Sequence, residues 1–321
     1  MKVLVLGGAG ELGANFSKLC IDAGHTVTVL DLVRFFETWR LKELGIQDKV
    51  KYVWQSTFDL LRSDIAPYNL ILDCACQADR PLGTTSPKHT LLNNLLGPLS
   101  LLECVRGLPT KPFIIYPSSS VEFLGVPREE QPITEDTIPK PTNLYGLTKW
   151  MAEELLQTYM RAYNVKGMVI RTGSCYGPMM RTDQFIAQCI IKCLRNQDII
   201  VRSPEATRTY TFTGDVMRFY KRFLAKFTDD PDKFNGVVVA NGGNKENKPY
   251  KTIIAAYMIR DITGSTNHIS AGEYEVGEAL NGTPVFQWEQ SQRAYDLLGW
   301  KPKFSFKKGL ERTVEWWRKH G

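Results

Sequence analysis

Tyr145 and Lys149 are the residues whose types and spacing point most directly to chemistry. Being four positions apart, they would lie one turn apart on the same face of a helix. A tyrosine hydroxyl ordinarily has a pKa of about 10, so it is a poor base at neutral pH. A nearby ammonium favours the phenolate electrostatically. The pair could therefore take a proton from a substrate hydroxyl while a hydride leaves the same carbon.

A glycine-rich turn near the N-terminus predicts where that hydride would go. The run Gly7-Gly8-Ala9-Gly10-Glu11-Leu12-Gly13 directly follows an apolar run that reads as a strand. Its spacing, G-x-x-G-x-x-G, allows a tight turn, close approach of backbone to a pyrophosphate, and packing of helix on strand. The helix that follows would offer free N–H groups to phosphates. We therefore expect dinucleotide contacts at Gly7, Gly10, Glu11, Leu12 and Gly13.

Asp31 indicates which dinucleotide is bound. It lies about 20 residues after the glycine run, at the end of the second predicted strand. A carboxylate there can accept hydrogen bonds from both ribose hydroxyls and would repel a 2′-phosphate, which favours NAD. Arg34 keeps NADP as the less favoured alternative. The other predicted cofactor contacts follow the third strand or belong to the catalytic pair: Asp59, Leu60, Tyr145 and Lys149.

Alternating strands and helices must position these residues. Predicted strands are Val3–Leu6, Thr26–Leu30, Val50–Trp54, Leu70–Leu72, Phe113–Tyr116 and Gly167–Ile170, and predicted helices are Glu11–Ala23, Pro87–Val105 and Leu144–Tyr163. Strands this uniformly apolar are typical of a parallel sheet buried on both faces. We therefore predict an α/β fold, a Rossmann-type doubly wound parallel sheet with a smaller C-terminal α+β domain.

The pattern changes after about residue 178. The expected elements there are the helices Phe185–Asn196, Asp215–Phe227 and Gly309–His320 and the strands Ile199–Val201 and Val237–Ala240. We predict that residues 1–178 hold the cofactor and the catalytic residues, and that 179–321 bind the substrate. Segments near 208–240 are expected to return to the first sheet.

Composition and charge exclude several other classes. The 321 residues are 43% hydrophobic and 23% charged, which excludes a disordered chain, collagen or a coiled coil. The net charge of +6 is scattered, so we expect no nucleic-acid partner. No apolar run approaches the roughly 18–20 residues of a membrane span. Seven irregularly spaced cysteines and no export signal predict reduced thiols, no metal site and a cytoplasmic protein.

Taken together, the sequence resembles the extended short-chain dehydrogenase/reductases, specifically the NAD-dependent nucleotide-sugar epimerases and dehydratases. The glycine run and the Tyr145/Lys149 pair are the family's central marks. Segments similar to the family's lie at 132–136, 149–153, 171–178 and 298–302, so the resemblance covers nearly the whole chain. It implies transient oxidation of a nucleotide sugar at C4, a 4-keto intermediate, and return of the hydride.

The resemblance also implies roles for single residues. Ser120 matches the catalytic Ser/Thr, whose hydroxyl would bind the sugar oxygen that Tyr145 deprotonates. Glu122 matches the Glu of dehydratases and UDP-glucuronate decarboxylases, a base for the proton alpha to the 4-keto group. Val121 replaces the Asp that serves as acid in dTDP-glucose dehydratases and cannot donate a proton.

Arg208 begins a stretch similar to the one that carries the family's diphosphate-binding arginine, and a guanidinium suits phosphate oxygens. The predicted substrate contacts are Ser120, Glu122, Ser174 and Arg208. Further positions depart from the family: Asp73 replaces a common His, Leu124 a usual Tyr and Ser174 a usual Asn. These departures bear on substrate identity more than on fold.

The exact reaction stays open at this point. Dehydratase-type chemistry, with 4-epimerisation close behind, is the first interpretation. A net NAD(P)H-dependent 4-keto-sugar reductase is the alternative, and a non-catalytic binding protein on the same fold is less favoured. The resemblance further implies a homodimer that pairs Pro87–Val105 and Leu144–Tyr163 with the same helices of a second copy.

Overall fold

The computed structural model describes residues 1–78, 80–273, 279–280 and 283–320. The chain forms two compact units, each assembled from several stretches of sequence. The first unit contains residues 1–119, 143–171 and 220–239, and the second contains 120–142, 172–219 and 240–321. Residues 120–142, which include two predicted site residues, therefore belong to the second unit. The cofactor and substrate roles of 1–178 and 179–321 stay predictions.

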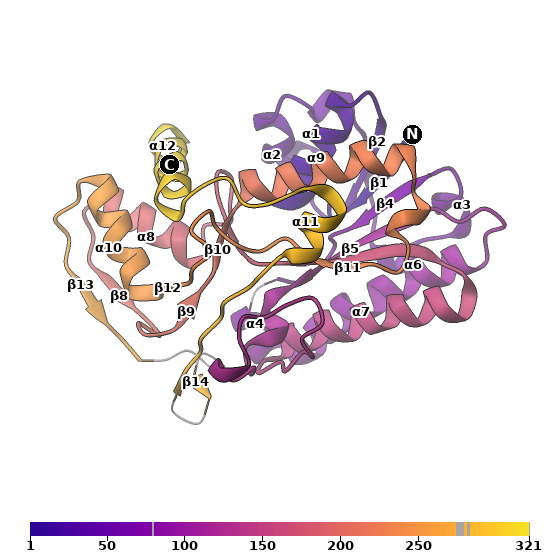
Figure 1. Ribbon diagram of the computed structural model, residues 1–321. Coiled ribbons are helices and arrows are strands. Elements are labelled where there is room, and N and C mark those ends of the chain that lie inside the picture. Colours follow the sequence, from indigo (N-terminus) through magenta and orange to yellow (C-terminus); the bar gives the residue numbers. More distant parts are fainter. Residues whose placement is uncertain (79, 274–278, 281–282, 321) are drawn as a thin grey trace. The chain divides into compact units, whose positions relative to one another are not determined.

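A seven-stranded sheet forms the centre of the first unit (Figure 1). Its order is β11-β6-β5-β4-β1-β2-β3, and β1 pairs in parallel with β2 and β4, β2 with β3, and β4 with β5. The strands are β1 (Lys2–Leu6), β2 (Thr26–Asp31), β3 (Lys51–Trp54), β4 (Leu70–Asp73), β5 (Phe113–Ser119), β6 (Lys166–Thr172) and β11 (Val238–Ala240). The order 3-2-1-4-5-6 is that of a Rossmann sheet. The predicted α/β fold is confirmed.

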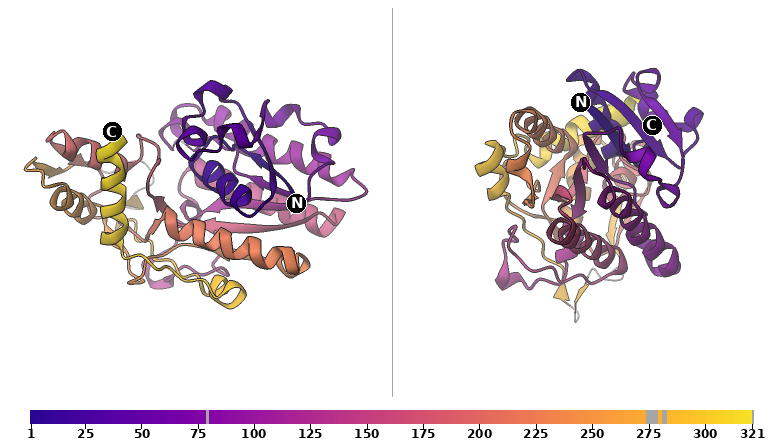
Figure 2. Two further views of the ribbon diagram at one scale, coloured as in Figure 1. Left: turned by 90° about the horizontal axis from the view of Figure 1, so that it is seen from above. Right: turned by 90° about the vertical axis from the view of Figure 1, so that its right-hand side faces the viewer.

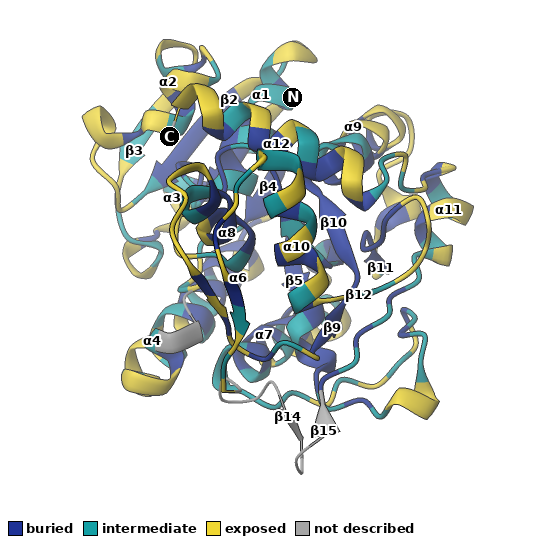
Figure 3. Cartoon of the chain, turned by 90° about the vertical axis from the view of Figure 1, so that its left-hand side faces the viewer, coloured by how far each residue is buried: buried dark blue, intermediate teal, exposed yellow. Residues whose placement is uncertain are grey.

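Helices cover both faces of this sheet, because side chains in a strand point alternately to opposite faces. On one face Leu4 and Leu6 join a core with α6 (Gly97–Arg106) and α7 (Leu144–Tyr163). The other face lies against α1 (Glu11–Asp22) and the part of α9 (Thr213–Asp229) that belongs to this unit. There Phe113 packs on Phe227, with ring centroids 4.8 Å apart. The layers can be followed in Figures 1 and 2, and Figure 3 shows the buried strands β4 and β5.

The segment predicted as one helix over 87–105 contains an irregular turn. It consists of α5 (Pro87–Leu91), a π-helical turn, η4 (Leu92–Leu96), and α6. The other short elements of the first unit are α2 (Trp39–Glu43), α3 (Arg62–Ile65), α4 (Arg80–Thr85), η1 (Phe35–Glu37), η2 (Gln47–Lys49), η3 (Thr57–Asp59) and η7 (Asp232–Phe234). The π turn carries the buried amide of Asn94, which reaches Thr148 of α7.

The described part of the second unit consists mainly of short strand pairs and helices. The pairs are β7 (Ser174–Tyr176) with β10 (Tyr210–Phe212), β9 (Thr207–Arg208) with β12 (Tyr250–Lys251), β8 (Ile199–Val201) with β13 (Ile269–Ala271), and β14 (Ala279–Leu280) with β15 (Thr283–Pro284). The helices are α8 (Phe185–Leu194), α10 (Thr252–Thr263), α11 (Gln292–Leu298) and α12 (Phe306–His320), and the 3-10 turns are η5 (Ser120–Phe123) and η6 (Arg128–Glu130). Its core combines α8, α10 and α12 through residues such as Ile190, Ile259 and Leu310.

The cysteines and the apolar helices were also subjects of prediction. All seven cysteines are described and each is a free thiol. Within the described ranges, no helix has the length and apolar character required to cross a lipid bilayer.

A buried ion pair ties α7 to β6 and gives a test of this packing. Glu153 is fully buried and binds Arg171 through two contacts, of 2.6 and 3.2 Å. We expect Glu153→Ala to lower the free energy of unfolding by about 3–5 kcal/mol, because it leaves a buried guanidinium without its carboxylate.

The matched control is Asp22→Ala, which breaks the exposed Lys18–Asp22 pair on α1. Exposed pairs contribute at most about 1 kcal/mol. Urea unfolding of both variants checks this prediction, and equal losses in the two would contradict it.

Candidate active site

The glycine turn between β1 and α1 is shaped by close backbone contacts. Gly7 has a φ of +69°, and a β-carbon there would lie 2.8 Å from the backbone of Ala75. A β-carbon at Gly13 would lie 2.6 Å from the Gly7 carbonyl oxygen. Side chains at either position would therefore push the turn apart. Gly10 is the N-cap of α1, and no side chain caps this helix end. A helix N-terminus without a side-chain cap suits a phosphate, as the NAD prediction requires.

Asp31 fixes the glycine turn from the end of β2. Its Oδ2 accepts a hydrogen bond from Ala9 N at 2.9 Å, and its Oδ1 accepts one from Val33 N at 3.1 Å. The carboxylate thus lies directly beside the turn. That position suits an NAD ribose and opposes a 2′-phosphate. The arrangement of turn, helix end and acid fits the cofactor that the sequence predicts.

Asp59 and Leu60, two further predicted cofactor contacts, lie after β3. Asp59 ends η3 and is exposed. The Leu60 side chain belongs to the core of the first unit, and its carbonyl oxygen accepts a hydrogen bond from Cys104 Sγ at 3.2 Å. A contact with cofactor stays a prediction for both residues.

Tyr145 and Lys149 lie in the first two turns of α7, as their spacing predicts. The helix begins at Leu144 and is capped by Asn143, whose Oδ1 accepts a hydrogen bond from Gly146 N at 2.9 Å. Tyr145 is therefore in the first turn, where the positive end of the helix dipole favours an anionic side chain. The helix end and the lysine charge both favour the phenolate.

Lys149 is 3% exposed, so its ammonium is almost completely withdrawn from water. Its Nζ lies 4.1 Å from the centroid of the ring of Tyr116, the middle residue of β5. A cation over an aromatic face is attracted by the ring quadrupole. Asp73, at the end of β4, is equally buried. Burial raises the pKa of Asp73 to about 6, against the opposing effects of the Lys149 charge and a hydrogen bond from the Ala75 backbone.

The π turn holds α7 in place next to this pair. Asn94 Oδ1 accepts a hydrogen bond from Gln77 N at 2.7 Å, and its Nδ2 donates to Thr148 Oγ1 at 3.0 Å. Thr148 in turn donates to the Tyr145 carbonyl oxygen at 2.9 Å. The chain of bonds connects the segment after β4 with the residues that flank the catalytic pair. π turns are frequent at functional sites, and sequence periodicity alone did not predict this one.

Ser120 and Glu122 lie on η5, in the second unit. Ser120 is 3% exposed and Glu122 is fully buried. Gln287 Nε2 donates a hydrogen bond to the Ser120 carbonyl oxygen at 2.5 Å. The Ser120 hydroxyl makes a hydrogen bond to the carboxylate of Glu289. The serine is thus held at both its backbone and its side chain.

Arg208 and Ser174 also belong to the second unit. Arg208 is on β9, 8% exposed, and its charge acts on Glu289. Ser174 begins β7 and pairs with Tyr210 of β10. The structure therefore brings Ser120, Glu289 and Arg208 into one polar cluster. Substrate contacts of Ser174, Arg208 and Glu122 stay predictions.

Glu289 is the residue of this cluster that could not be predicted from the sequence. Its partner Ser120 is far away in the sequence, so no spacing rule could associate the two. The structural role of Asp73 was equally invisible, although its departure from the family pattern drew attention to it. Among the described residues, no group of three or more His, Cys, Asp or Glu side chains could hold a metal ion.

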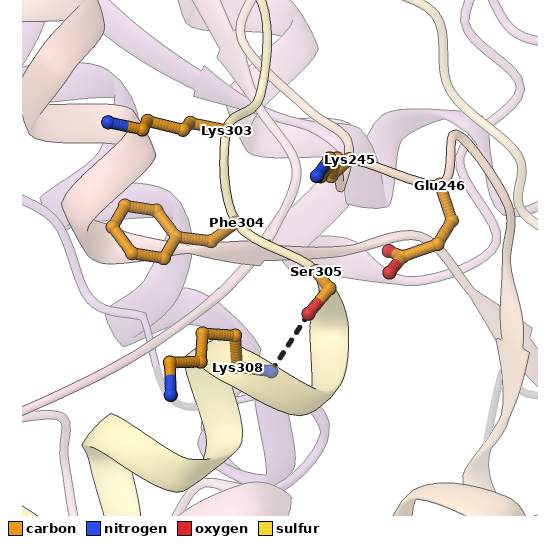
Figure 4. Close-up of a pocket in the computed structure, with 6 residues that line it drawn as sticks. All are labelled: Lys245, Glu246, Lys303, Phe304, Ser305 and Lys308. Atoms are coloured by element: carbon orange, nitrogen blue, oxygen red, sulfur yellow. Dashed lines mark hydrogen bonds between the residues drawn. The ribbon is translucent and has the colours of Figure 1, made fainter.

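A cavity of about 460 Å³ lies elsewhere in the second unit, at the start of α12 (Figure 4). Its lining consists of Lys245, Glu246, Lys303, Phe304, Ser305 and Lys308. None of these is a predicted site residue. The helix end there is already capped, since Phe306 N donates to Glu246 Oε2 at 3.3 Å and Lys308 N to Ser305 Oγ at 3.0 Å. The candidate functional residues therefore form two separate polar clusters, one within each unit.

The buried Asp73 carboxyl predicts an unusual pH dependence of stability. In the unfolded chain this carboxyl ionises near its ordinary pKa of 3.8, but in the folded protein near 6. Between these values the folded state holds a proton that the unfolded state has lost, so stability falls as pH rises. Asn cannot ionise. We expect Asp73→Asn to gain on the order of 2–3 kcal/mol over wild type between pH 4 and pH 7.

Urea unfolding at a series of pH values measures this difference, with Asp22→Asn on the exposed face of α1 as the control. The control should follow the wild-type curve. Parallel curves for Asp73→Asn and wild type would show that the buried carboxyl ionises normally.

Comparisons with known proteins agree with this geometry. The family model for the NAD dependent epimerase/dehydratase family matches residues 3–236. A relative from Arabidopsis thaliana, UDP-glucuronate 4-epimerase 6, is 27% identical over 99% of this chain and 71% of its own length. The dTDP-glucose 4,6-dehydratase of Mycobacterium tuberculosis is 24% identical over 99% of this chain and 93% of its own length.

A solved structure has the same fold. The UDP-glucuronic acid 4-epimerase of Bacillus cereus, in complex with UDP-glucuronic acid and NAD, superposes with a TM-score of 0.87. It is 20% identical, and the match covers all of both chains. The family model covers well over half of the sequence and includes the glycine turn, Asp31, Tyr145 and Lys149. The chain therefore belongs to the NAD dependent epimerase/dehydratase family.

Proposed function

We propose that this protein is an NAD-dependent nucleotide-sugar enzyme that oxidises its substrate transiently at C4, with dehydratase-type chemistry or 4-epimerisation as the outcome. The observation that carries the proposal is the buried Lys149 ammonium one helical turn from Tyr145 at the N-terminus of α7. Both the charge and the helix end favour a phenolate there. A chain that merely bound a nucleotide would have no use for an activated tyrosine.

In the proposed reaction, different residues bind the cofactor, transfer the proton and bind the sugar. Gly7, Gly10, Gly13 and Asp31 hold NAD, which supplies a reversible hydride acceptor when bound. Tyr145 removes the proton from the sugar hydroxyl, and Lys149 stabilises the resulting charge. Ser120 binds the same sugar oxygen.

Glu122 favours dehydratase-type chemistry. Its complete burial on η5, next to Ser120, resembles the environment of a carboxylate that acts on carbon acids, because a dry carboxylate is the stronger base. A 4-keto group would acidify the adjacent proton enough for a carboxylate to remove it. Val121 supplies no acid for a leaving hydroxyl, so 4-epimerisation stays the close alternative. Relatives of both kinds match this chain.

A nucleotide diphosphate is the part of the substrate that we propose the protein binds through Arg208. Arg208 provides a fork of donors that suits phosphate oxygens, and Ser174 is proposed to contact the sugar. The related structure from Bacillus cereus contains UDP-glucuronic acid. Because of Arg208, we propose that this chain also binds a nucleotide-diphosphate sugar. The assay with several nucleotide sugars identifies its base and its sugar.

We propose a cytoplasmic homodimer as the working form. Leu92 and Leu96 of η4 and Met151 of α7 are each at least 40% exposed, an apolar set that a second copy could cover. Light scattering of the purified protein tests the dimer directly, since a monomer mass would exclude it.

The reaction is tested by incubating the enzyme with UDP-, dTDP-, GDP- and CDP-sugars in deuterated water. Deuterium at C5 of the product supports Glu122 as a base, and inversion at C4 without that label supports epimerisation. Stoichiometric loss of absorbance at 340 nm would instead indicate the net reductase.

Tyr145→Phe should lower kcat by about 10²–10⁴-fold, because it removes the acid–base group. The matched control is Tyr163→Phe at the other end of α7, which should keep wild-type activity. Turnover of Tyr145→Phe at the wild-type rate would refute the catalytic assignment.

A further inference from the structure

Residues 285–290 form an extended segment whose two faces differ. Val285, Gln287 and Glu289 are buried, whereas the residues between them are partly exposed. Thr207 N donates to the Val285 carbonyl oxygen at 2.8 Å, which binds one edge of the segment to β9. On the other edge, Ile133 N donates to the Trp288 carbonyl oxygen at 2.7 Å. Because alternate residues share a face, the segment presents Gln287 and Glu289 on one side.

That side holds the predicted catalytic serine. Gln287 donates a hydrogen bond to the Ser120 carbonyl oxygen, and the Glu289 carboxylate accepts a hydrogen bond from the Ser120 hydroxyl. Two glycines make room for the carboxylate. A β-carbon at Gly242 would lie 1.9 Å from Glu289 Oε2, and one at Gly173 would lie 2.6 Å from it. The position of this carboxylate is therefore determined by three separate parts of the chain.

The hydrogen bonding of Glu289 differs from that of a structural carboxylate in the same unit. Asp215, fully buried, accepts hydrogen bonds from Lys303 N at 3.0 Å, Phe304 N at 2.9 Å and Arg218 Nη1 at 2.7 Å. Glu289 Oε1 is buried, and among the described residues it has no hydrogen-bond partner. A buried acceptor without a hydrogen-bond partner loses its hydration without compensation. The Glu289 carboxylate is thus poorly stabilised as an anion.

The groups that face Glu289 explain its ionisation. Burial raises its pKa to about 7, and the hydrogen bond from Ser120 and the positive charge of Arg208 oppose the rise. The loops at Gly173 and Gly242 contribute backbone, and Thr209 Oγ1 accepts the Glu289 N–H at 3.2 Å. Glu122 on η5 is a further titratable group of this unit.

Glu135 is the titratable group near the outer edge of the segment. It lies two residues beyond Ile133, and its Oε1 accepts a hydrogen bond from Arg293 N at 3.1 Å. It is therefore occupied with backbone donors, in contrast to Glu289.

We propose that Glu289 is a positioning residue whose protonation state sets the direction of the Ser120 hydroxyl. The inference rests on the proposed function, in which Ser120 donates a hydrogen bond to the sugar oxygen. A serine hydroxyl has one proton to donate. An ionised Glu289 accepts that proton and withholds it from the sugar. A protonated Glu289 donates to Ser120 Oγ instead, which leaves the serine proton for the substrate.

The first test needs no substrate. The protein is prepared with ¹³C-carboxyl glutamate, and the Glu289 signal is assigned by its loss in Glu289→Gln. We expect this signal to titrate near pH 7 in wild type. In Ser120→Ala the midpoint should move upward by about one unit, because the hydrogen bond that favours the anion is lost. Titration at an ordinary pH, or an unchanged midpoint in Ser120→Ala, would overturn the proposal.

The second test is the pH profile of kcat. Wild-type kcat should fall about tenfold per pH unit once Glu289 ionises. Glu289→Gln should lose this alkaline fall, since its amide donates to Ser120 Oγ at every pH, while the KM changes by less than about threefold. The matched control, Glu135→Gln, should keep the wild-type profile.

Two outcomes separate this inference from the proposed function. If Glu289→Gln shows the same pH profile of kcat as wild type, or loses activity equally at every pH, the proposed role of Glu289 is refuted. The proposed reaction is not affected by either result. If wild type turns over no nucleotide sugar, the proposed function fails, and the NMR titration still decides whether Glu289 and Ser120 are coupled.

Discussion

An ammonium group held almost out of water at Lys149 is the constraint on which the rest of the site depends. A buried charge is costly unless its surroundings offset it. Here the Tyr116 ring and the buried Asp73 carboxyl provide part of that compensation. The charge in turn suits Tyr145 to the role of a base, because it favours the phenolate at the start of α7. The sheet, the π turn and the helix cap all serve to keep this charge in place.

The second unit contains two buried carboxylates whose surroundings differ. Asp215 is surrounded by donors and is suited to fixing structure, whereas Glu289 is left partly unsatisfied beside Ser120. Two carboxylates at similar depth thus differ in the number of hydrogen bonds that support the anion. Groups with perturbed ionisation cluster at functional sites, and this contrast is the reason for assigning a role to Glu289.

Local features were predictable from the sequence, and long-range contacts were not. The glycine turn and the Tyr145/Lys149 pair were predictable because their spacing within one turn or one helix determines which groups they bring together. Asp31 was predictable because it ends the strand that follows the glycine turn. The π turn at Leu92–Leu96 breaks helical periodicity and escaped prediction. The assignment of 120–142 to the second unit, and the contact of Ser120 with Glu289, join distant parts of the chain. Neither leaves a pattern in a single sequence.

Following a deuterium atom from C4 of the sugar tests the central claim most directly. A nucleotide sugar labelled at C4 is converted to completion, and the label is located by mass spectrometry and NMR. Because the proposed oxidation is transient, the label should be recovered on the sugar product, with none in free reduced nicotinamide. Recovery of the label in released NADH, or its loss to water, would contradict transient oxidation by a bound cofactor.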